Sequence, residues 1–354
     1  MHAYNPLPAG LGTSTLRLDR PTAGRTDAPT PVDPPAPRAP AERFGAPWPL
    51  RESPHLEEAR PHAGAWLEKF GLASAPHGGE VVRDWKLAEA AAWLYPDASA
   101  RGVALAAALL GWYFAPFDGA AGERGKDLQR AARLAAELGE VVSRPGVATS
   151  DPVSAAYAEL WRRSGEGMSQ AWRDRAAQSW REFFAAQLEE VSLRVNGRIP
   201  DAAMHLRLRD TTGWVHVLID LMEAVGGYEL PAIVRHAPVL EGLRQVTAEL
   251  LSLGNDLVSA DREAAAGDAA KNLLLMLEAR EGCARPEAIV KLRKLWDERL
   301  ARFLHLEQRA PDLDGVLDLA GRTALRRYLQ GLRDLVAGGS HWHHTSGRYG
   351  AAAP

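Results

Sequence analysis

The stretch VLEGLRQVTAELLSLGNDLVSADRE, residues 239–263, joins a helical apolar pattern to a polar stripe. On a helix, Asn255, Ser259 and Glu263 stand four residues apart, so each turns only about 40° from the last and all three share one face. Apolar residues upstream recur every three or four positions, which predicts a long amphipathic helix with one face in a core. These apolar residues are Val239, Leu240, Leu243, Val246, Leu250 and Leu251.

The polar stripe offers an amide oxygen, a hydroxyl and a carboxylate. Three hard oxygen donors spaced about 6 Å along a helix suit Mg²⁺ better than zinc or calcium, because Mg²⁺ prefers oxygen and keeps part of its water shell. Mg²⁺ held through so few protein atoms usually awaits a phosphate. The alternative is a solvated polar face, because short patterns of this kind also arise by chance.

Two other segments carry residues suited to a phosphate. Arg209, in HLRLRDTTGW (205–214), precedes Asn255 by 46 residues, and its planar guanidinium can bind phosphate oxygens through two parallel hydrogen bonds. Near the C-terminus, HWHHTSGRYG (341–350) contains Trp342, Arg348 and Tyr349.

These segments resemble the NDxxSxxxE metal motif, the diphosphate-sensing arginine and the W-x5-RY arrangement of bacterial class I terpene synthases. The resemblance implies that Asn255, Ser259 and Glu263 bind metal, and that Arg209, Arg262, Arg348 and Tyr349 bind a substrate diphosphate. It also implies catalytic roles for Arg209 as sensor, Thr212 as linker and Gly213 as effector residue at a helix break. Glycine suits the last position, because it takes backbone shapes that a residue with a Cβ resists.

The family's aspartate-rich motif is incomplete in this chain. It should follow the helix after Tyr95-Pro96-Asp97-Ala98-Ser99, where the sequence reads FAPFDGAAGE (114–123). By resemblance Asp118 is a metal ligand, with Glu123 as an alternative, but Gly119 stands in place of the second aspartate of DDxxxE. Two readings follow. An active enzyme is favoured because the other ligands are intact, and the alternative is a metal-impaired, non-catalytic helical relative that binds prenyl diphosphate or a partner.

Aromatic residues are candidates for the wall of a substrate cavity. The family points the residue four before the first aspartate, here Phe114, into the cavity, and Trp214 beside the helix break is a second candidate, with core packing as its alternative. An aromatic face stabilises a carbocation without offering a nucleophile that would trap it. His341, His343 and His344 cluster in sequence, but they lack companion cysteines or carboxylates, which disfavours a zinc site.

Composition agrees with an all-α protein. The chain has 354 residues, 46% of them hydrophobic, and the run Ile289, Val290, Leu292, Leu295, Trp296, Leu300, Phe303 and Leu304 again shows helical spacing. We expect a proline-rich disordered leader at residues 1–50, which holds eleven of the 24 prolines. By resemblance, residues 51–350 form a single-domain class I terpenoid synthase helical bundle with a central active-site cavity.

Charge and cysteine content narrow the partners. A net charge of −3 provides no basic field for nucleic acid, and a single cysteine, Cys283, excludes an internal disulfide. No apolar stretch of about twenty residues could span a membrane, so we expect a soluble, cytoplasmic monomer or homodimer. The resemblance implies an isoprenyl diphosphate substrate, with farnesyl diphosphate ahead of geranyl and geranylgeranyl diphosphates, and three Mg²⁺ ions, with Mn²⁺ as a substitute.

Overall fold

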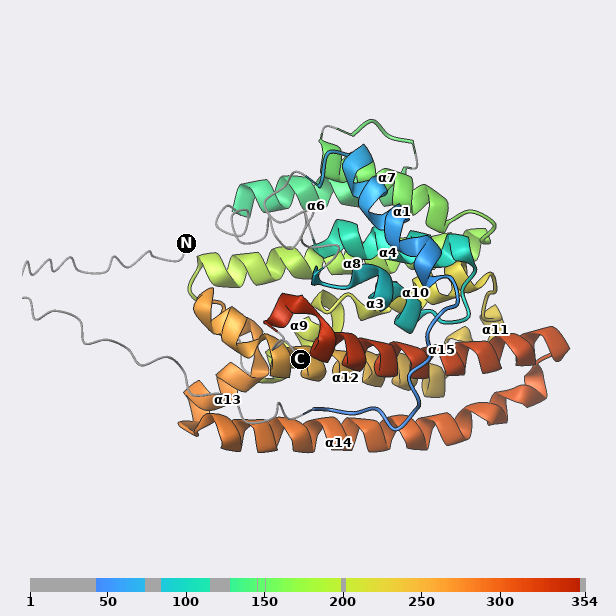
Figure 1. Cartoon of the computed structure of the whole chain (residues 1–354). Coiled ribbons are helices and arrows are strands. Elements are labelled where there is room, and N and C mark those ends of the chain that lie inside the picture. Colours follow the sequence, from blue (N-terminus) through green and yellow to red (C-terminus); the bar gives the residue numbers. More distant parts are fainter. Residues whose placement is uncertain are drawn as a thin grey trace, which may run out of the picture. The chain divides into compact units, whose positions relative to one another are not determined.

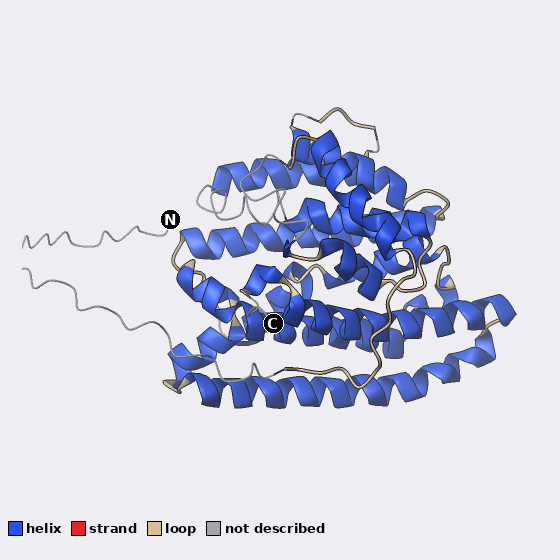
Figure 2. Cartoon of the chain, in the orientation of Figure 1, coloured by secondary structure: helices blue, strands red, loops and turns tan. Residues whose placement is uncertain are grey.

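The computed structural model describes residues 43–73, 84–114, 128–144, 146–149, 151–198 and 202–350. Every regular element in these ranges is a helix, as Figure 2 shows. The all-α class predicted from the sequence is therefore confirmed. The α-helices are α1 (Leu56–Lys69), α3 (Leu87–Leu94), α4 (Ala100–Trp112), α6 (Leu128–Ser143), α7 (Pro152–Ser164), α8 (Gln170–Val195), α9 (Ala202–Thr212), α10 (Val215–Gly226), α11 (Ala232–Arg235), α12 (Pro238–Ala265), α13 (Leu273–Glu281), α14 (Arg285–Arg309) and α15 (Leu319–Thr345).

Three short 3₁₀ turns complete the described secondary structure. They are η2 (Ala269–Lys271), η3 (Ala310–Val316) and η4 (Gly347–Tyr349). Of these, η2 follows the polar end of α12, and η4 carries the C-terminal Arg–Tyr pair. Both turns thus stand close in sequence to residues singled out above.

Helix α12 is the hub of the helical unit. It packs against α14, α15, α9, α10 and α13, and Figure 1 shows it running between α15 and α14. Leu240, Leu243 and Val246 are fully buried, with Leu250 and Leu251 nearly so, which confirms the predicted core face. Burying one such side chain contributes roughly 1.5–3 kcal/mol to the free energy of folding, so this face contributes much of the stability with which α12 packs in the unit.

Helix α14 confirms its predicted pattern with one exception. Leu292, Trp296 and Phe303 are buried, whereas Val290 is 63% exposed. The three-four spacing of the buried residues leaves Val290 on another face of the helix.

The helical unit begins before α1. Residues 43–50 run along α14, where Phe44 packs on Trp296 and Trp48 on Phe303, at ring-centroid distances of 5.7 and 4.9 Å. Arg43 likewise belongs to the helical unit. The expected division into a leader of residues 1–50 and a domain of 51–350 stays a prediction, and residues 1–42 lie outside the described part.

Candidate functional site

The predicted helix break lies between α9 and α10. Helix α9 ends at Thr212, and α10 begins at Val215. Gly213 has little room, because a Cβ there would come within 2.7 Å of the Arg209 carbonyl oxygen and 2.9 Å of Ser252 Oγ. The left-handed residue is Trp214, with φ 63°. The requirement for glycine at 213 is therefore close packing rather than the backbone freedom that the sequence suggested.

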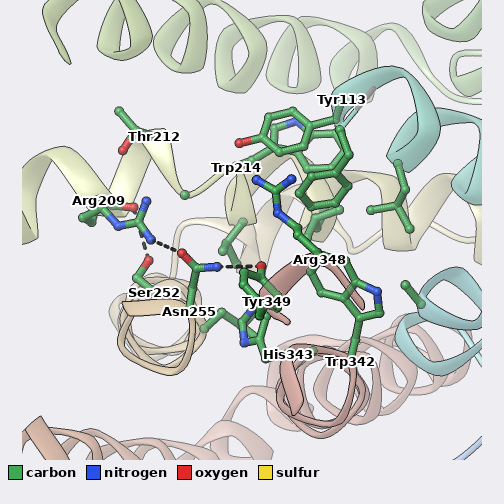
Figure 3. A pocket seen from close by; sticks show the side chains of 18 of the residues that line it. Tyr113, Arg209, Thr212, Trp214, Ser252, Asn255, Trp342, His343, Arg348 and Tyr349 are labelled. Atoms are coloured by element: carbon green, nitrogen blue, oxygen red, sulfur yellow. Dashed lines mark hydrogen bonds between the residues drawn. The ribbon is translucent and has the colours of Figure 1, made fainter. Parts of the chain in front are cut away.

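Arg209, at the end of α9, is held by residues of α12. Its Nη2 donates to Asn255 Oδ1 at 2.9 Å (Figure 3) and to Asp256 Oδ1 at 3.1 Å. Burial opposes the charge, but Asp256, Glu263 and Glu190 outweigh it and raise the pKa of Arg209 above its usual value. Its buried Nε has no acceptor among the described residues, so a fixed cation keeps one N–H for a ligand.

Asp256 follows Asn255 and binds the same Arg209 nitrogen. It is 1% exposed and accepts hydrogen bonds from Arg209, from His205 Nε2 at 3.2 Å, and from the Leu273 backbone N–H at 2.9 Å. Burial acts against its ionisation, but Arg209 and His205 outweigh burial and lower the pKa of Asp256. This carboxylate therefore stays charged and anchors the cationic side of the site.

The predicted metal triad occupies one face of α12. Asn255 accepts from Arg209 and donates from Nδ2 to the Tyr349 hydroxyl at 2.8 Å, as Figure 3 shows. Ser259 Oγ donates to Glu263 Oε2 at 3.0 Å. Burial and the charge of Asp256 raise the pKa of Glu263. Arg262 Nη2 lies 3.5 Å from Glu263 Oε1 and offsets part of this effect. A set of amide, hydroxyl and carboxylate oxygens fits a hard divalent cation.

The C-terminal segment closes against aromatic rings. The Arg348 guanidinium is buried, with its Cζ 4.6 Å from the ring centre of Trp85 and 4.7 Å from that of Phe114. Trp342 Nε1 and Ser346 Oγ both donate to the Trp85 carbonyl oxygen, at 2.6 and 3.0 Å. These contacts place the Arg–Tyr pair of η4 beside the triad.

Aromatic side chains form the opposite side of the same region. Tyr113 stacks on Trp214 with ring centroids 4.4 Å apart, and Phe114 packs on Trp342 at 5.0 Å. The Trp342 ring comes from α15 and the Trp214 ring from the break before α10. Tyr113 and Phe114 directly follow α4. Both candidate wall residues, Phe114 and Trp214, therefore border the polar groups above.

One cavity of about 140 Å³ joins these groups, roughly ten times the volume that one water needs. It is lined by ten of the predicted residues: Phe114, Arg209, Thr212, Gly213, Trp214, Asn255, Arg262, Glu263, Arg348 and Tyr349. Ser259 is fully buried behind them. Asp118, Gly119 and Glu123 lie outside the described residues. The roles assigned to all these residues stay predictions.

Sequence reasoning missed part of the cavity wall. Glu190 and Gln187 of α8 and Lys271 of η2 line it as well, and Lys271 Nζ lies 3.5 Å from Glu190 Oε2. Gln187 Nε2 donates to the Thr212 carbonyl oxygen at 3.2 Å, which ties α8 to the helix break. Lys271 follows Glu263 by only eight residues, and this short distance in sequence could have indicated it. The pattern of α8 does not distinguish Glu190 or Gln187 from its other polar residues.

Comparison with known proteins decides the family. A family model described as "Terpene synthase family 2, C-terminal metal binding" matches residues 117–302. The chain belongs to the terpene synthase family. This terpene synthase is 32% identical over 314 residues to a (-)-beta-caryophyllene synthase from Saccharothrix espanaensis, across 87% of this chain and 88% of that protein.

Solved structures agree with the family assignment. Wild-type cucumene synthase is 43% identical, with a TM-score of 0.76 over 85% of this chain and all of that one. Germacradien-4-ol synthase from Streptomyces citricolor is 32% identical, with a TM-score of 0.76 over 85% of this chain and 98% of that one. The predicted family and enzyme class are thus confirmed. Among the described helices, none is both long and apolar enough to cross a bilayer.

Proposed function

We propose that this terpene synthase ionises an acyclic isoprenyl diphosphate in the presence of Mg²⁺ and cyclises the resulting carbocation to a terpene with release of diphosphate. The observation that supports this most is the single cavity shared by Arg209, the triad face of α12, the Arg348–Tyr349 pair and an aromatic wall. Farnesyl diphosphate is the first candidate substrate. Two of the similar enzymes carry "(2E,6E)-farnesyl diphosphate cyclizing" in their names.

The polar end of the cavity is suited to bind and neutralise a diphosphate. Arg209 is fixed in place by Asp256, Arg348 is buried close to Tyr349, and Arg262 lies over the Tyr349 ring at 5.9 Å. Prepositioned cations of this kind stabilise a leaving group without reorganising during the reaction. Asn255, Ser259 and Glu263 would hold Mg²⁺ together with Asp118, with three ions in all. When bound, Mg²⁺ supplies further charge to stabilise the departing diphosphate.

The aromatic end of the cavity is suited to the hydrocarbon. Phe114 and Trp214 present ring faces and no nucleophile, so they can stabilise a cation by about 1–2 kcal/mol without trapping it. Closure of the C-terminal segment over the diphosphate excludes water, which would otherwise quench the cation early. The cavity contour then guides cyclisation.

The test is direct. Purified protein is incubated with farnesyl diphosphate and Mg²⁺, volatile products are analysed by gas chromatography with mass spectrometry, and diphosphate release is measured in parallel. Geranyl and geranylgeranyl diphosphates serve as comparison substrates, and EDTA serves as the metal control. Cyclic terpenes that form only with metal support the proposal. Absence of turnover with all three substrates would overturn it.

A further inference from the structure

Asn272 lies behind the triad and contacts it directly. It is fully buried at the start of α13, and its Nδ2 donates to Ser259 Oγ at 3.2 Å and to Glu263 Oε2 at 2.8 Å. The same nitrogen lies 2.8 Å from the Asp256 carbonyl oxygen, so its two N–H groups are shared among three acceptors. One amide group thus meets two of the three predicted metal ligands and the backbone one turn before Ser259.

The position of this amide is fixed from the other side as well. Asn272 caps α13, because its Oδ1 accepts from the Leu275 N–H at 3.2 Å. The next residue, Leu273, donates its N–H to Asp256 Oδ2 at 2.9 Å. The start of α13 is therefore pinned to α12 at several points, and the Asn272 amide cannot turn away from the triad without breaking the cap.

These hydrogen bonds determine which ligand atoms remain available to a cation. Glu263 Oε2 accepts from both Ser259 and Asn272, whereas Oε1 lies 3.5 Å from Arg262 Nη2, so Oε1 is the oxygen that these two hydrogen bonds leave available to a cation. Ser259 Oγ gives its only proton to Glu263 and accepts from Asn272, which leaves one lone pair. Without the Asn272 donor, both side chains would be free to adopt other rotamers.

We propose that Asn272 is a positioning residue of the metal site, which orients Ser259 and Glu263 so that their remaining oxygens converge on one cation. This inference rests on the proposed function. Capping of α13 requires only Oδ1 of Asn272, whereas the contacts with Ser259 and Glu263 use Nδ2. Substitution can therefore separate the capping role from the contacts with the triad. Groups that orient metal ligands in this way typically change metal affinity by 10–100-fold when removed.

The experiment compares Asn272→Ser with Asn272→Ala in the full-length protein. Serine keeps a cap but lacks an amide that reaches Glu263, and alanine loses both. Mg²⁺ is titrated in the presence of inorganic diphosphate, and binding is followed by tryptophan fluorescence, since Trp214 and Trp342 line the cavity. The metal-free melting temperature is recorded in parallel. Both variants should need about tenfold more Mg²⁺ for half-saturation, and only alanine should lose the stability of the cap.

Asp151→Ala is the matched control. Asp151 caps α7 by accepting from the N–H groups of Val153 and Ser154, and it does not line the cavity. Its loss should lower the melting temperature and leave the Mg²⁺ titration unchanged. A half-saturating Mg²⁺ concentration within twofold of wild type in Asn272→Ser overturns the positioning role. A wild-type protein that does not respond to Mg²⁺ and diphosphate overturns the proposed function and this inference together.

Discussion

At the scale of single residues, Asp256 organises the polar end of the cavity. Its buried carboxylate fixes Arg209 and His205 and also accepts the first N–H of α13. A charge placed before the substrate arrives needs no reorganisation during the reaction, which makes its electrostatic effect larger than that of a mobile side chain. Glu263 differs, because Asp256 and burial both disfavour its charged form until a cation is bound.

Glu263→Gln should abolish most turnover and leave the fold intact. Its carboxylate is the only formal charge in the predicted triad, so we expect product formation to fall on the order of a hundredfold or more. Glutamine keeps the shape and removes a buried charge, so the melting temperature without metal should stay the same or rise slightly. Steady-state kinetics and thermal unfolding measure both effects. Product formation at the wild-type rate would remove the triad from the mechanism.

Arg209→Lys tests the geometry of the sensor rather than its charge. Lysine keeps a cation but has no planar guanidinium that could bind phosphate oxygens while its Nη2 holds Asn255 and Asp256. Ionisation should slow by more than about tenfold, because a charge-assisted contact in a closed site is worth several kcal/mol. The rate of diphosphate release from a true substrate measures this step. A change of less than threefold would contradict the sensor assignment.

At the scale of elements, the break between α9 and α10 joins the sensor to the aromatic wall. Arg209 and Gly213 belong to the last turn of α9 and the residue after it, and Trp214 takes a left-handed backbone that costs roughly 1 kcal/mol for a bulky side chain. Gln187 holds the Thr212 carbonyl oxygen from α8. The break is thus a defined structure with partners on both sides.

Gly213→Ala should damage both stability and turnover. The new Cβ would meet the Arg209 carbonyl oxygen at 2.7 Å and Ser252 Oγ at 2.9 Å, so the backbone must shift at a cost of about 1–3 kcal/mol. Urea unfolding and steady-state kinetics measure the two effects. Gly139→Ala is the control, since Gly139 lies within α6 with open space around its Cβ position, and it should be neutral or stabilising by up to about 1 kcal/mol. Equal behaviour of the two variants would show that close packing at 213 is unimportant.

The aspartate-rich segment can be tested although it lies outside the described residues. If Asp118 is the only metal ligand of the aspartate-rich segment, Gly119→Asp should lower the Mg²⁺ concentration for half-maximal activity, because a second carboxylate raises local negative charge. Asp118→Asn should nearly abolish turnover. Measuring activity as a function of Mg²⁺ concentration tests the effects of both substitutions. Unchanged turnover in Asp118→Asn would move the ligand assignment to Glu123, and activity that appears only in Gly119→Asp would favour the metal-impaired reading.

At the scale of the whole molecule, the C-terminal segment is built into the fold. Trp342 and Ser346 bind the carbonyl oxygen of Trp85, far away in sequence, and His343 is buried at the cavity between α15 and α12. Burial, with the positive charges of His344, Arg209 and Arg348, lowers the pKa of His343 to about 3. The folded protein therefore keeps this imidazole neutral.

Stability should fall in acid because of His343. In the unfolded chain an ordinary histidine takes up a proton below about pH 6.5, whereas the folded protein does so only near pH 3, so this stability is present above 6.5 and is lost as pH falls. Relative to His343→Gln, wild type should lose up to about 1.4 kcal/mol per pH unit below 6.5. Urea unfolding at pH 5, 6 and 7 measures it. Parallel profiles of the two proteins would contradict this assignment.

Periodicity and motif spacing predicted the fold class of this protein and several residues of its cavity. The all-α class and the core face of α12 follow from local sequence, because helical periodicity acts within a few residues. The break after Thr212 follows from the family resemblance. Ten of the residues that the motifs singled out line one cavity. Their chemical roles remain predictions.

Only the tertiary structure decided which partners surround those residues. His205 and Arg209 meet on Asp256, Asn272 meets Glu263, and Lys271 faces Glu190, each across different elements. Such contacts depend on the angles and offsets at which helices pack, which no periodic pattern specifies. For the same reason the sequence could not show that Gly213 is confined by Ser252.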